Sequence, residues 1–204
     1  MSVERIAAIV LAAGRSSRMG PHNKLLESID GKAIIAPVAE VAIASGVEPV
    51  IVVTGFEAER IEEALRGLTV TFAHNAQFAE GMSSSIKAGF KALPADCDGA
   101  LILLGDMPRV ERRDIEALIA AFAKKGRDTI CIPVRDSRRG NPVLWGASYF
   151  AEMMGLRGDV GAKQLIPKHA EHVIEVPVAS NGIFADVDTP ADLAELRSSS
   201  AAKP

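Results

Sequence analysis

The sequence contains little cysteine, and what it has is not arranged as a metal site or a disulfide framework. Its two cysteines, Cys97 and Cys131, lie far apart and lack the short spacing of metal ligands. The first residues carry an acid and an arginine ahead of an apolar stretch that is too short, and interrupted too early, for a secretory signal peptide. These features are typical of a protein whose cysteine thiols remain reduced, and we expect a cytoplasmic protein.

Long apolar runs and an excess of positive charge are also missing. No apolar run approaches the roughly 20 residues that span a bilayer, so we expect no membrane association. The formal net charge is −3, which excludes a global basic field that would hold nucleic acid or an anionic membrane surface. Any anion-binding site must therefore be local.

Histidine is scarce, and its pattern does not predict a metal site. The four histidines show no i, i+4 pairing and no acid partner; they are His22, His74, His169 and His172. We therefore expect none of them to act as a metal ligand or a general base.

What the chain does contain is a regular alternation of strand-like and helix-like segments. Short runs rich in Val, Ile and Leu are expected to form strands at 5–12, 49–55, 69–74, 99–105, 129–134 and 172–178. Helical spacing of apolar residues occupies 34–46, 57–67, 83–94 and 111–126. This order predicts an α/β fold with a mostly parallel, doubly wound sheet, in which ligands bind beyond the carboxyl ends of the strands.

The 204 residues, 48% of them hydrophobic, are enough for one sizeable core. After about residue 135 the alternation gives way to segments rich in glycine and charge, which we interpret as an elaboration of the same domain. Thr189 and Pro190 are expected to open a last helix. We predict a single domain over 1–198 and a flexible tail over 199–204.

The segment 11–24, LAAGRSSRMGPHNK, follows the first predicted strand and concentrates positive charge. Glycine lets backbone N–H groups approach an anion, and the cations Arg18 and Lys24 would add charge-assisted bonds to phosphate oxygens. The segment matches neither the P-loop pattern nor the dinucleotide pattern G-x-G-x-x-G. By spacing alone, a polyphosphate site and an ordinary polar turn with solvated arginines are about equally favoured.

Two aspartates could hold a divalent cation beside such a site. Asp106 follows the apolar run 99–104, at the end of a predicted central strand, where a hard oxygen ligand suits Mg²⁺. Asp188 directly precedes the predicted last helix. A turn or capping role is the alternative for both residues, and for Asp188 taken alone it is the favoured one.

An ordered set of segments over nearly the whole chain resembles the nucleotidyltransferase family that matures the molybdenum cofactor. The segments are 11–35, GMSSSIKAG at 81–89, LLGDMP at 103–108, RGNPVLW at 139–145, GDVGA at 158–162 and DVDTPADL at 186–193. The resemblance implies a three-layer, Rossmann-like nucleotidyltransferase fold. It also implies transfer of a nucleoside monophosphate from a nucleoside triphosphate, with Mg²⁺, to a phosphorylated acceptor.

Within this family the cytidylyl-transferring members usually read LAAG in the first loop and the guanylyl-transferring members read LAGG. Ala13 therefore points to CTP, with molybdopterin as the acceptor and with transient contact to a molybdoenzyme or its chaperone. The remaining alternatives are use of GTP, a cytidylyltransferase for a sugar or polyol phosphate, and a carrier of nucleotide or molybdopterin that performs no chemistry.

The resemblance also assigns residues to roles. For the nucleotide these are Leu11, Ala12, Ala13, Gly14, Arg18, Lys24, Asn75, Ser83 and Ser84, with Arg18, Lys24 and Asp106 as the catalytic set. Asp106 and Asp188 would hold Mg²⁺. For the acceptor they are Arg139, Gly140, Asn141, Gly158, Asp159 and Gly161. Helix capping by Ser83, a turn role for Asn75 and solvated loop charges are the competing interpretations.

Overall fold

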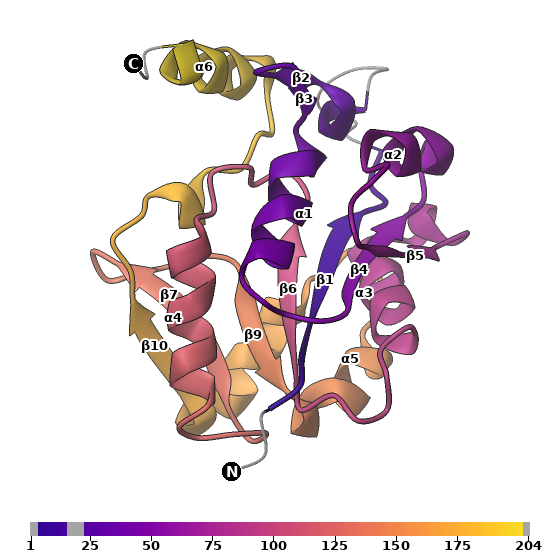
Figure 1. Ribbon diagram of the computed structural model, residues 1–204. Coiled ribbons are helices and arrows are strands. Elements are labelled where there is room, and N and C mark those ends of the chain that lie inside the picture. The colour runs from indigo at the N-terminus through magenta and orange to yellow at the C-terminus, as the bar shows by residue number, and fades with distance from the viewer. Residues whose placement is uncertain (1–3, 16–22, 202–204) are drawn as a thin grey trace.

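The computed structural model describes residues 4–15 and 23–201. A twisted sheet of eight strands has the order β10-β7-β9-β6-β1-β4-β5, with β8 joined to β7 (Figure 1). The strands are β1 (Ile6–Ala12), β4 (Val50–Thr54), β5 (Thr71–His74), β6 (Gly99–Leu104), β7 (Ile130–Arg135), β8 (Arg138–Arg139), β9 (Val143–Gly146) and β10 (Val173–Pro177). A separate small hairpin pairs β2 (Ser28–Ile29) with β3 (Lys32–Ala33).

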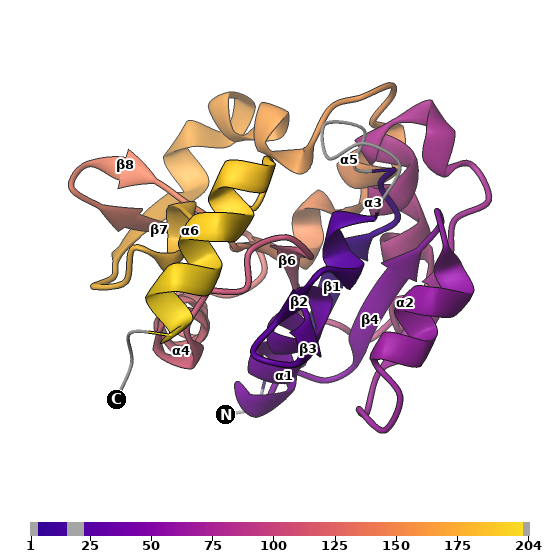
Figure 2. The ribbon, with the colours of Figure 1, turned by 90° about the horizontal axis from the view of Figure 1, so that it is seen from above.

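Helices cover both faces of this sheet. The α-helices are α1 (Ile35–Ala44), α2 (Ala58–Ala64), α3 (Met82–Lys91), α4 (Arg112–Phe122), α5 (Phe150–Gly155) and α6 (Pro190–Ala201). Short 3-10 helices lie at η2 (Lys24–Leu26), η3 (Phe78–Glu80), η4 (Ala147–Tyr149), η5 (Ala162–His172) and η6 (Gly182–Phe184). Seen from above, the sheet runs between the two sets of helices (Figure 2). The α/β, three-layer architecture with a mostly parallel sheet is confirmed.

The central strand shows why its sequence is apolar at every position. β1 pairs in parallel with β4 on one side and with β6 on the other. Val10 faces a core that contains residues of α1 and α4, whereas Ile9 faces a core that contains residues of α3 and α5. Because both faces are covered, the strand reads as a continuous apolar run and not as an alternating one.

Four strands, β2, β3, β8 and β9, were not predicted, and of these β9 is the one inserted in the middle of the large sheet. β9 lies between β6 and β7 and runs antiparallel to both, and its Trp145 is fully buried. It spans only four residues and follows a charged, glycine-containing turn, so its local sequence carries little periodicity. The change of rhythm after residue 135 therefore reflects an antiparallel insertion into the same sheet.

The last helix begins as expected. Asp192 Oδ2 accepts hydrogen bonds from the Thr189 N–H at 2.7 Å and the Thr189 hydroxyl at 2.8 Å. The Asp192 N–H donates to Thr189 Oγ1 at 3.2 Å, so side chain and backbone cap each other. The proposed boundary at residue 198 stays a prediction. Within the described residues, no helix is long and apolar enough to cross a membrane.

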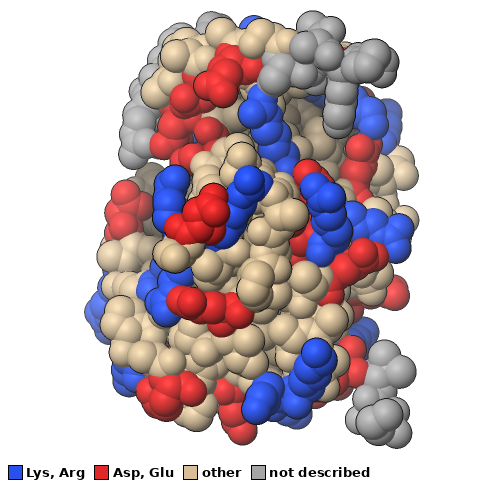
Figure 3. All heavy atoms as spheres, turned by 90° about the vertical axis from the view of Figure 1, so that its left-hand side faces the viewer, with Lys and Arg blue, Asp and Glu red and all other residues tan. Residues whose placement is uncertain are grey.

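The face that carries the β10 edge of the sheet shows no extended field of one sign among the described residues. Positive and negative side chains interleave there (Figure 3). Arg139 on β8, for example, pairs with Glu175 on β10 at 2.8 Å. The described residues of this face therefore form no continuous basic surface.

Candidate active site

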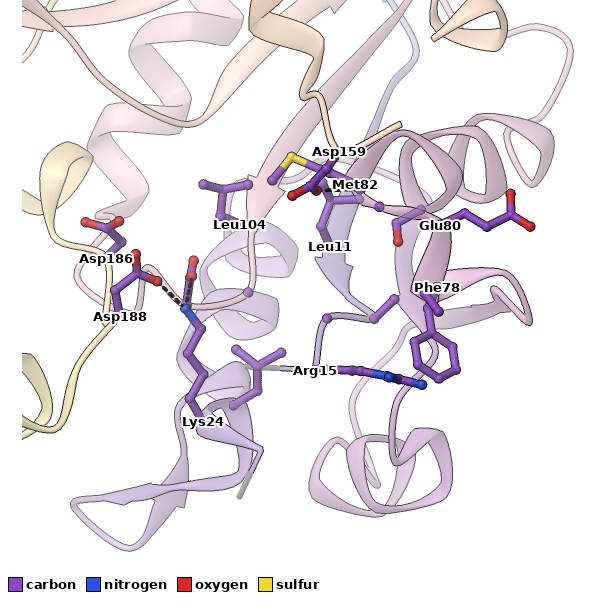
Figure 4. Close-up of a pocket in the computed structure, with 18 residues that line it drawn as sticks. Leu11, Arg15, Lys24, Phe78, Glu80, Met82, Leu104, Asp159, Asp186 and Asp188 are labelled. Atoms are coloured by element: carbon purple, nitrogen blue, oxygen red, sulfur yellow. Dashed lines mark hydrogen bonds and ion pairs between the residues drawn. The ribbon is translucent and has the colours of Figure 1, made fainter. Parts of the chain in front are cut away.

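A cavity of about 630 Å³ opens at the carboxyl ends of β1 and β6 (Figure 4). Its walls come from the loop after β1, from η2, from the η3–α3 junction, from the end of β6 and from the segments around residues 159 and 186–188. The lining residues are Leu11, Ala13, Gly14, Arg15, Lys24, Leu25, Phe78, Ala79, Glu80, Gly81, Met82, Ser85, Leu104, Gly105, Asp106, Asp159, Asp186 and Asp188. The cavity therefore lies where an open α/β sheet binds its ligands.

A lysine between two aspartates forms the charged centre of the cavity. Lys24 Nζ lies 2.6 Å from Asp106 Oδ2 and 2.7 Å from Asp188 Oδ1. The side chains of Lys24 and Asp106 are 13% and 18% exposed, and that of Asp188 is 34% exposed. One cation thus bridges two carboxylates from segments that are far apart in sequence.

Local backbone contacts bring the three residues together. The β6 strand ends at Leu104, and the N–H of the next residue, Gly105, donates to the Leu11 carbonyl at 3.0 Å. A Cβ at residue 105 would lie 2.7 Å from that carbonyl oxygen, so only glycine allows β1 and β6 to approach so closely here. The Val187 N–H donates to the Asp106 carbonyl at 3.0 Å, which brings Asp188 alongside Asp106.

The backbone of Lys24 is held by its neighbours. The Leu25 N–H donates to Asn23 Oδ1 at 3.1 Å, and Asn23 Nδ2 donates to the Phe56 carbonyl at 3.4 Å. Leu25 is buried in the core. The start of η2 is therefore anchored, while the four-carbon stem of Lys24 reaches toward Asp188 (Figure 4).

The surroundings of Lys24 set its protonation state. Burial acts to lower the pKa of the ammonium, but the charge of Asp106 and the hydrogen bonds to Asp106 and Asp188 outweigh it. The pKa of Lys24 is therefore held above its ordinary value. Lys24 is a cation throughout the physiological pH range.

The carboxylate pair fits a divalent cation that is shared with a ligand. Asp106 Oδ1 is buried and has no hydrogen-bond partner among the described residues, so one oxygen of the pair has an unused lone pair. The described part of the chain holds no group of three or more His, Cys, Asp or Glu that could bind a metal. Mg²⁺ commonly binds through one or two carboxylates and completes its shell with water and substrate phosphate, and this donor set matches that mode.

The loop after β1 is only partly described. Leu11, Ala13 and Gly14 line the cavity, whereas Ala12 is buried in the core on the α1 side of the sheet. The Ala13 carbonyl already accepts a hydrogen bond from the Phe56 N–H at 3.1 Å. Arg18 lies outside the described residues, so its assignment to the phosphates stays a prediction.

A second cation from the same loop reaches the cavity. The Arg15 guanidinium lies over the Phe78 ring, 5.3 Å from its centroid, and Figure 4 shows it extending toward η3. A contact of this kind is a cation–π interaction. Arg15 belongs to the segment 11–24, but the sequence assigns it no individual role, because spacing alone does not tell which cation of a loop faces a cavity.

The serines and Asn75 occupy different positions from those expected. Ser85 lines the cavity that holds Lys24, while Ser83 and Ser84 line a neighbouring cavity of about 750 Å³ together with Asn75. Asn75 Nδ2 donates to Ser84 Oγ at 2.8 Å and to Ser85 Oγ at 3.1 Å. The amides at the start of α3 are also occupied, because the Ser83 N–H donates to the Gly158 carbonyl at 3.3 Å.

These contacts favour a structural role for Asn75 and Ser84 in this conformation, and their assignment to the nucleotide stays a prediction. Ser85 belongs to the same run of serines, whose hydroxyls all suit base or ribose contacts by sequence. The helical period distinguishes these serines, because residues 83 and 85 of a helix cannot face the same side.

The residues assigned to the acceptor fall into two groups. Asp159 lines the main cavity, and its Oδ1 accepts a hydrogen bond from the Met82 N–H at 3.1 Å. Gly158 lines the neighbouring cavity, and a Cβ on Gly161 would lie 3.0 Å from Met82 Sδ. The GDVGA segment therefore packs against the start of α3.

The second group lies on β8 and in the segment that follows it. Arg139 is on β8 and pairs with Glu175, and the Gly140 N–H donates to the Pro133 carbonyl at 2.8 Å. The Asn141 N–H donates to the Ile183 carbonyl at 2.9 Å. None of these residues lines either of the two cavities described here, so their role toward an acceptor stays a prediction.

The expectation that no histidine has an acid partner was wrong. His169 Nε2 lies 2.9 Å from Glu152 Oε1, and the His169 ring packs edge-on against Tyr149. The partner is invisible in sequence because Glu152 belongs to α5 and His169 to η5. Neither residue lines the cavity that holds Lys24.

The chain is similar to known proteins over most of its length. Residues 8–173 match the family described as the MobA-like NTP transferase domain. The purine catabolism protein PucB from Bacillus subtilis (strain 168) is 30% identical to this chain over an aligned length of 212 residues. The alignment covers 94% of this chain and 96% of PucB. The bifunctional protein GlmU from Anaeromyxobacter dehalogenans (strain 2CP-C) is 34% identical over 121 residues, so the chain spans only 25% of GlmU.

Solved structures show the same fold over nearly the whole chain. A nucleotidyl transferase from Methanothermobacter thermautotroptrophicus has a TM-score of 0.83 and 25% identity and covers 96% of this chain and 97% of its own. A CMP:2-keto-3-deoxy-manno-octonic acid synthetase in complex with CTP has a TM-score of 0.75 and 20% identity, with 97% and 99% of the two chains covered. At that identity the second likeness concerns the fold alone.

Proposed function

The chain belongs to the MobA-like NTP transferase domain family, and from this premise we propose that it transfers CMP from CTP to the terminal phosphate of molybdopterin. The products would be molybdopterin cytosine dinucleotide and pyrophosphate. Nucleotidyl transfer is the activity of the family. The choice of CTP, of molybdopterin and of Mg²⁺ is the proposal.

The observation that carries the proposal is the grouping of Lys24, Asp106 and Asp188 in one cavity at the strand ends. A bare polyphosphate site would need only cations, and a bare turn would need no paired carboxylates. Both charge types together suit a triphosphate that arrives with a divalent cation. A carrier that performs no chemistry would have no need for the buried carboxylate oxygen of Asp106.

In the proposed reaction an oxygen of the acceptor phosphate forms a bond to the α-phosphorus of CTP, and the bond from that phosphorus to the bridging oxygen of pyrophosphate breaks. The nucleophile is already ionised near neutral pH, so no strong general base is needed. The contribution of the chain is to position the reactants and to neutralise charge.

Several residues that line the cavity have a proposed part in this scheme. Lys24 and Arg15 supply positive charge toward the leaving pyrophosphate, and Arg18 is assigned the same part from the sequence. Asp106 and Asp188 would hold Mg²⁺, which when bound would neutralise phosphate charge. The backbone at Ala13 and Gly14 and the hydroxyl of Ser85 line the remaining wall of the cavity and are available to orient the nucleotide.

The proposal that the base is cytosine depends on Ala13. Ala13 lines the cavity, and its methyl group is packed so closely that a Cβ on Gly55 would lie 2.8 Å from it. A methyl at this point narrows the space beside the loop, which is compatible with a pyrimidine. The main support remains the resemblance of the LAAG segment to cytidylyl-transferring members of the family.

A cytidylyltransferase for a sugar phosphate is the second candidate, because the fold is shared with a synthetase solved in complex with CTP. One assay separates the candidates. Pyrophosphate release is measured with CTP and with GTP, each in the presence of molybdopterin, molybdenum-loaded molybdopterin or a sugar phosphate. The proposal expects release only with CTP and a molybdopterin form.

The other results of this assay are equally informative. Equal use of GTP would overturn the base assignment, and release with a sugar phosphate alone would favour the second candidate. Nucleotide binding without any release would favour the carrier. The Asp106→Ala variant serves as the inactive control in every arm.

A further inference from the structure

The ion-paired centre of the cavity suggests how the site loads its metal. We propose that the Lys24 ammonium occupies the place of the divalent cation in the nucleotide-free protein, so that metal enters only together with the nucleotide. This inference rests on the proposed role of Asp106 and Asp188 as metal ligands. It concerns the order of binding and is independent of the identity of base and acceptor.

Lys24 Nζ lies within 2.6 and 2.7 Å of one oxygen from each carboxylate, so the ammonium lies between the two groups that would hold a metal. A divalent cation that used Asp106 Oδ2 and Asp188 Oδ1 would require the position that the ammonium now fills. The lysine and the metal therefore exclude each other at these two oxygens.

The charge of Lys24 also disfavours a second cation at the same two carboxylates. The cavity is lined by the cations Arg15 and Lys24 and by five carboxylates, those of Glu80, Asp106, Asp159, Asp186 and Asp188. Because Lys24 and Asp106 are largely shielded from water, the ammonium strongly reduces the local attraction of Asp106 and Asp188 for a divalent cation. A nucleoside triphosphate brings several negative charges. In its presence the ammonium and the metal can both be neutralised, because the phosphates accept the lysine while the carboxylates accept the metal.

The side chain of Lys24 can move while its backbone stays in place. The backbone at the start of η2 is anchored by Asn23 and by the buried Leu25, so only the side chain of Lys24 has to move. The side chain of a lysine is a flexible four-carbon stem that carries a compact point charge. The side chain can therefore move from the carboxylates to a phosphate without any change in the fold.

Manganese binding in the absence of nucleotide tests this inference. Mn²⁺ is titrated into the protein and free Mn²⁺ is followed by electron paramagnetic resonance, with neither nucleotide nor acceptor present. We expect Lys24→Met to bind Mn²⁺ tighter than the wild type by about tenfold or more, because the competing charge is removed. Lys24→Arg keeps the charge and should bind as weakly as the wild type.

Two further variants locate the effect. Lys32→Met removes a surface lysine that pairs with Glu40 and should leave Mn²⁺ affinity unchanged. Asp106→Asn combined with Lys24→Met should abolish the gain, because one of the two carboxylates is lost. Circular dichroism verifies that each variant is folded, and Lys24→Gln replaces Lys24→Met if the latter is not.

An Mn²⁺ affinity in Lys24→Met equal to or weaker than that of the wild type would overturn the inference, as would a gain that survives the loss of Asp106. Failure of the proposed function would look different. It would show as absent pyrophosphate release from CTP, with the Mn²⁺ result unchanged.

Discussion

Asp159 Oδ1 accepts a hydrogen bond from the Met82 N–H at 3.1 Å, so a loop 77 residues downstream caps the start of α3. Gly81 makes this contact accessible, because a Cβ at residue 81 would lie 2.7 Å from the Asp159 backbone and its φ of +104° is unfavourable for other residues. Gly81, Met82 and Asp159 all line the cavity. The cap thus holds one wall of the candidate active site in place.

Removing this cap should weaken the fold modestly and reshape the wall. We expect Asp159→Ala to lower the free energy of unfolding by about 1 kcal/mol, the usual effect of losing an N-cap side chain. Urea denaturation followed by circular dichroism measures this change. Glu59→Ala is the control, since Glu59 is an exposed residue of α2 that lines neither cavity. Equal stability of Asp159→Ala and the wild type would show that the hydrogen bond contributes nothing.

Asp106 should be essential for turnover and its neighbour Asp186 should not. Asp106→Ala removes one of the two carboxylates, and we expect kcat to fall by about 10²-fold or more, the effect of losing one preorganised electrostatic group. Asp186 lines the same cavity but lies away from the Lys24 ammonium in Figure 4. Asp186→Ala should therefore retain most of the activity. The measurement is steady-state pyrophosphate release, and comparable losses in both variants would argue against the assignment of Asp106.

Gly55 should tolerate no side chain. A Cβ there would lie 2.7 Å from Phe78 Cβ and 2.9 Å from the Ala13 carbonyl oxygen, so Gly55→Ala must displace the loop after β1 or η3. We expect a loss of roughly 1 to 3 kcal/mol in the free energy of unfolding, together with weaker nucleotide binding.

Thermal denaturation and nucleotide titration measure the two effects. Gly67→Ala controls for the general effect of replacing glycine, because a Cβ at residue 67 meets nothing within 4 Å, although its φ of +88° adds some strain. If Gly55→Ala binds nucleotide like the wild type, the packing between Gly55 and Ala13 is irrelevant to the site.

The buried thiol of Cys131 should make stability depend on pH in the alkaline range. Burial raises the pKa of this thiol from 9.0 to about 12. The unfolded chain loses the thiol proton near pH 9 and the folded chain does not, so unfolding releases a proton and stability falls as the pH rises from about 9 toward 12. Below pH 9 the thiol is neutral in both states and contributes no pH dependence.

Cys131→Ala should remove this component, which urea denaturation at pH 8 and at pH 10 can measure. In the wild type, neither Cys131 nor the buried Cys97 should react with a thiol reagent at pH 8 until the protein is unfolded. Rapid modification of Cys131 in the folded protein would contradict the burial seen in the structure.

Much of the architecture could be predicted because its physics is local. The strands β1, β4 and β6 are covered on both faces and therefore read as continuous apolar runs, while α1 and α4 show helical spacing. β9 escaped prediction because four residues carry too little periodicity, and its place between β6 and β7 depends on pairing with distant strands. The pairing of Glu152 with His169 escaped for the same reason.

The sequence by itself determined the α/β class. It also predicted an anion site in the loop after β1 and, through the family resemblance, named Lys24, Asp106 and Asp188 as the residues to examine. The fold class follows from composition and periodicity, and the candidate residues follow from motifs, which are properties of short segments. Only the tertiary structure decided that the three side chains meet, that Ser85 and Arg15 face the cavity, and that Asp159 caps α3. Such contacts join segments up to 164 residues apart, and their geometry depends on how the strands end and how closely backbones approach, as at Gly105.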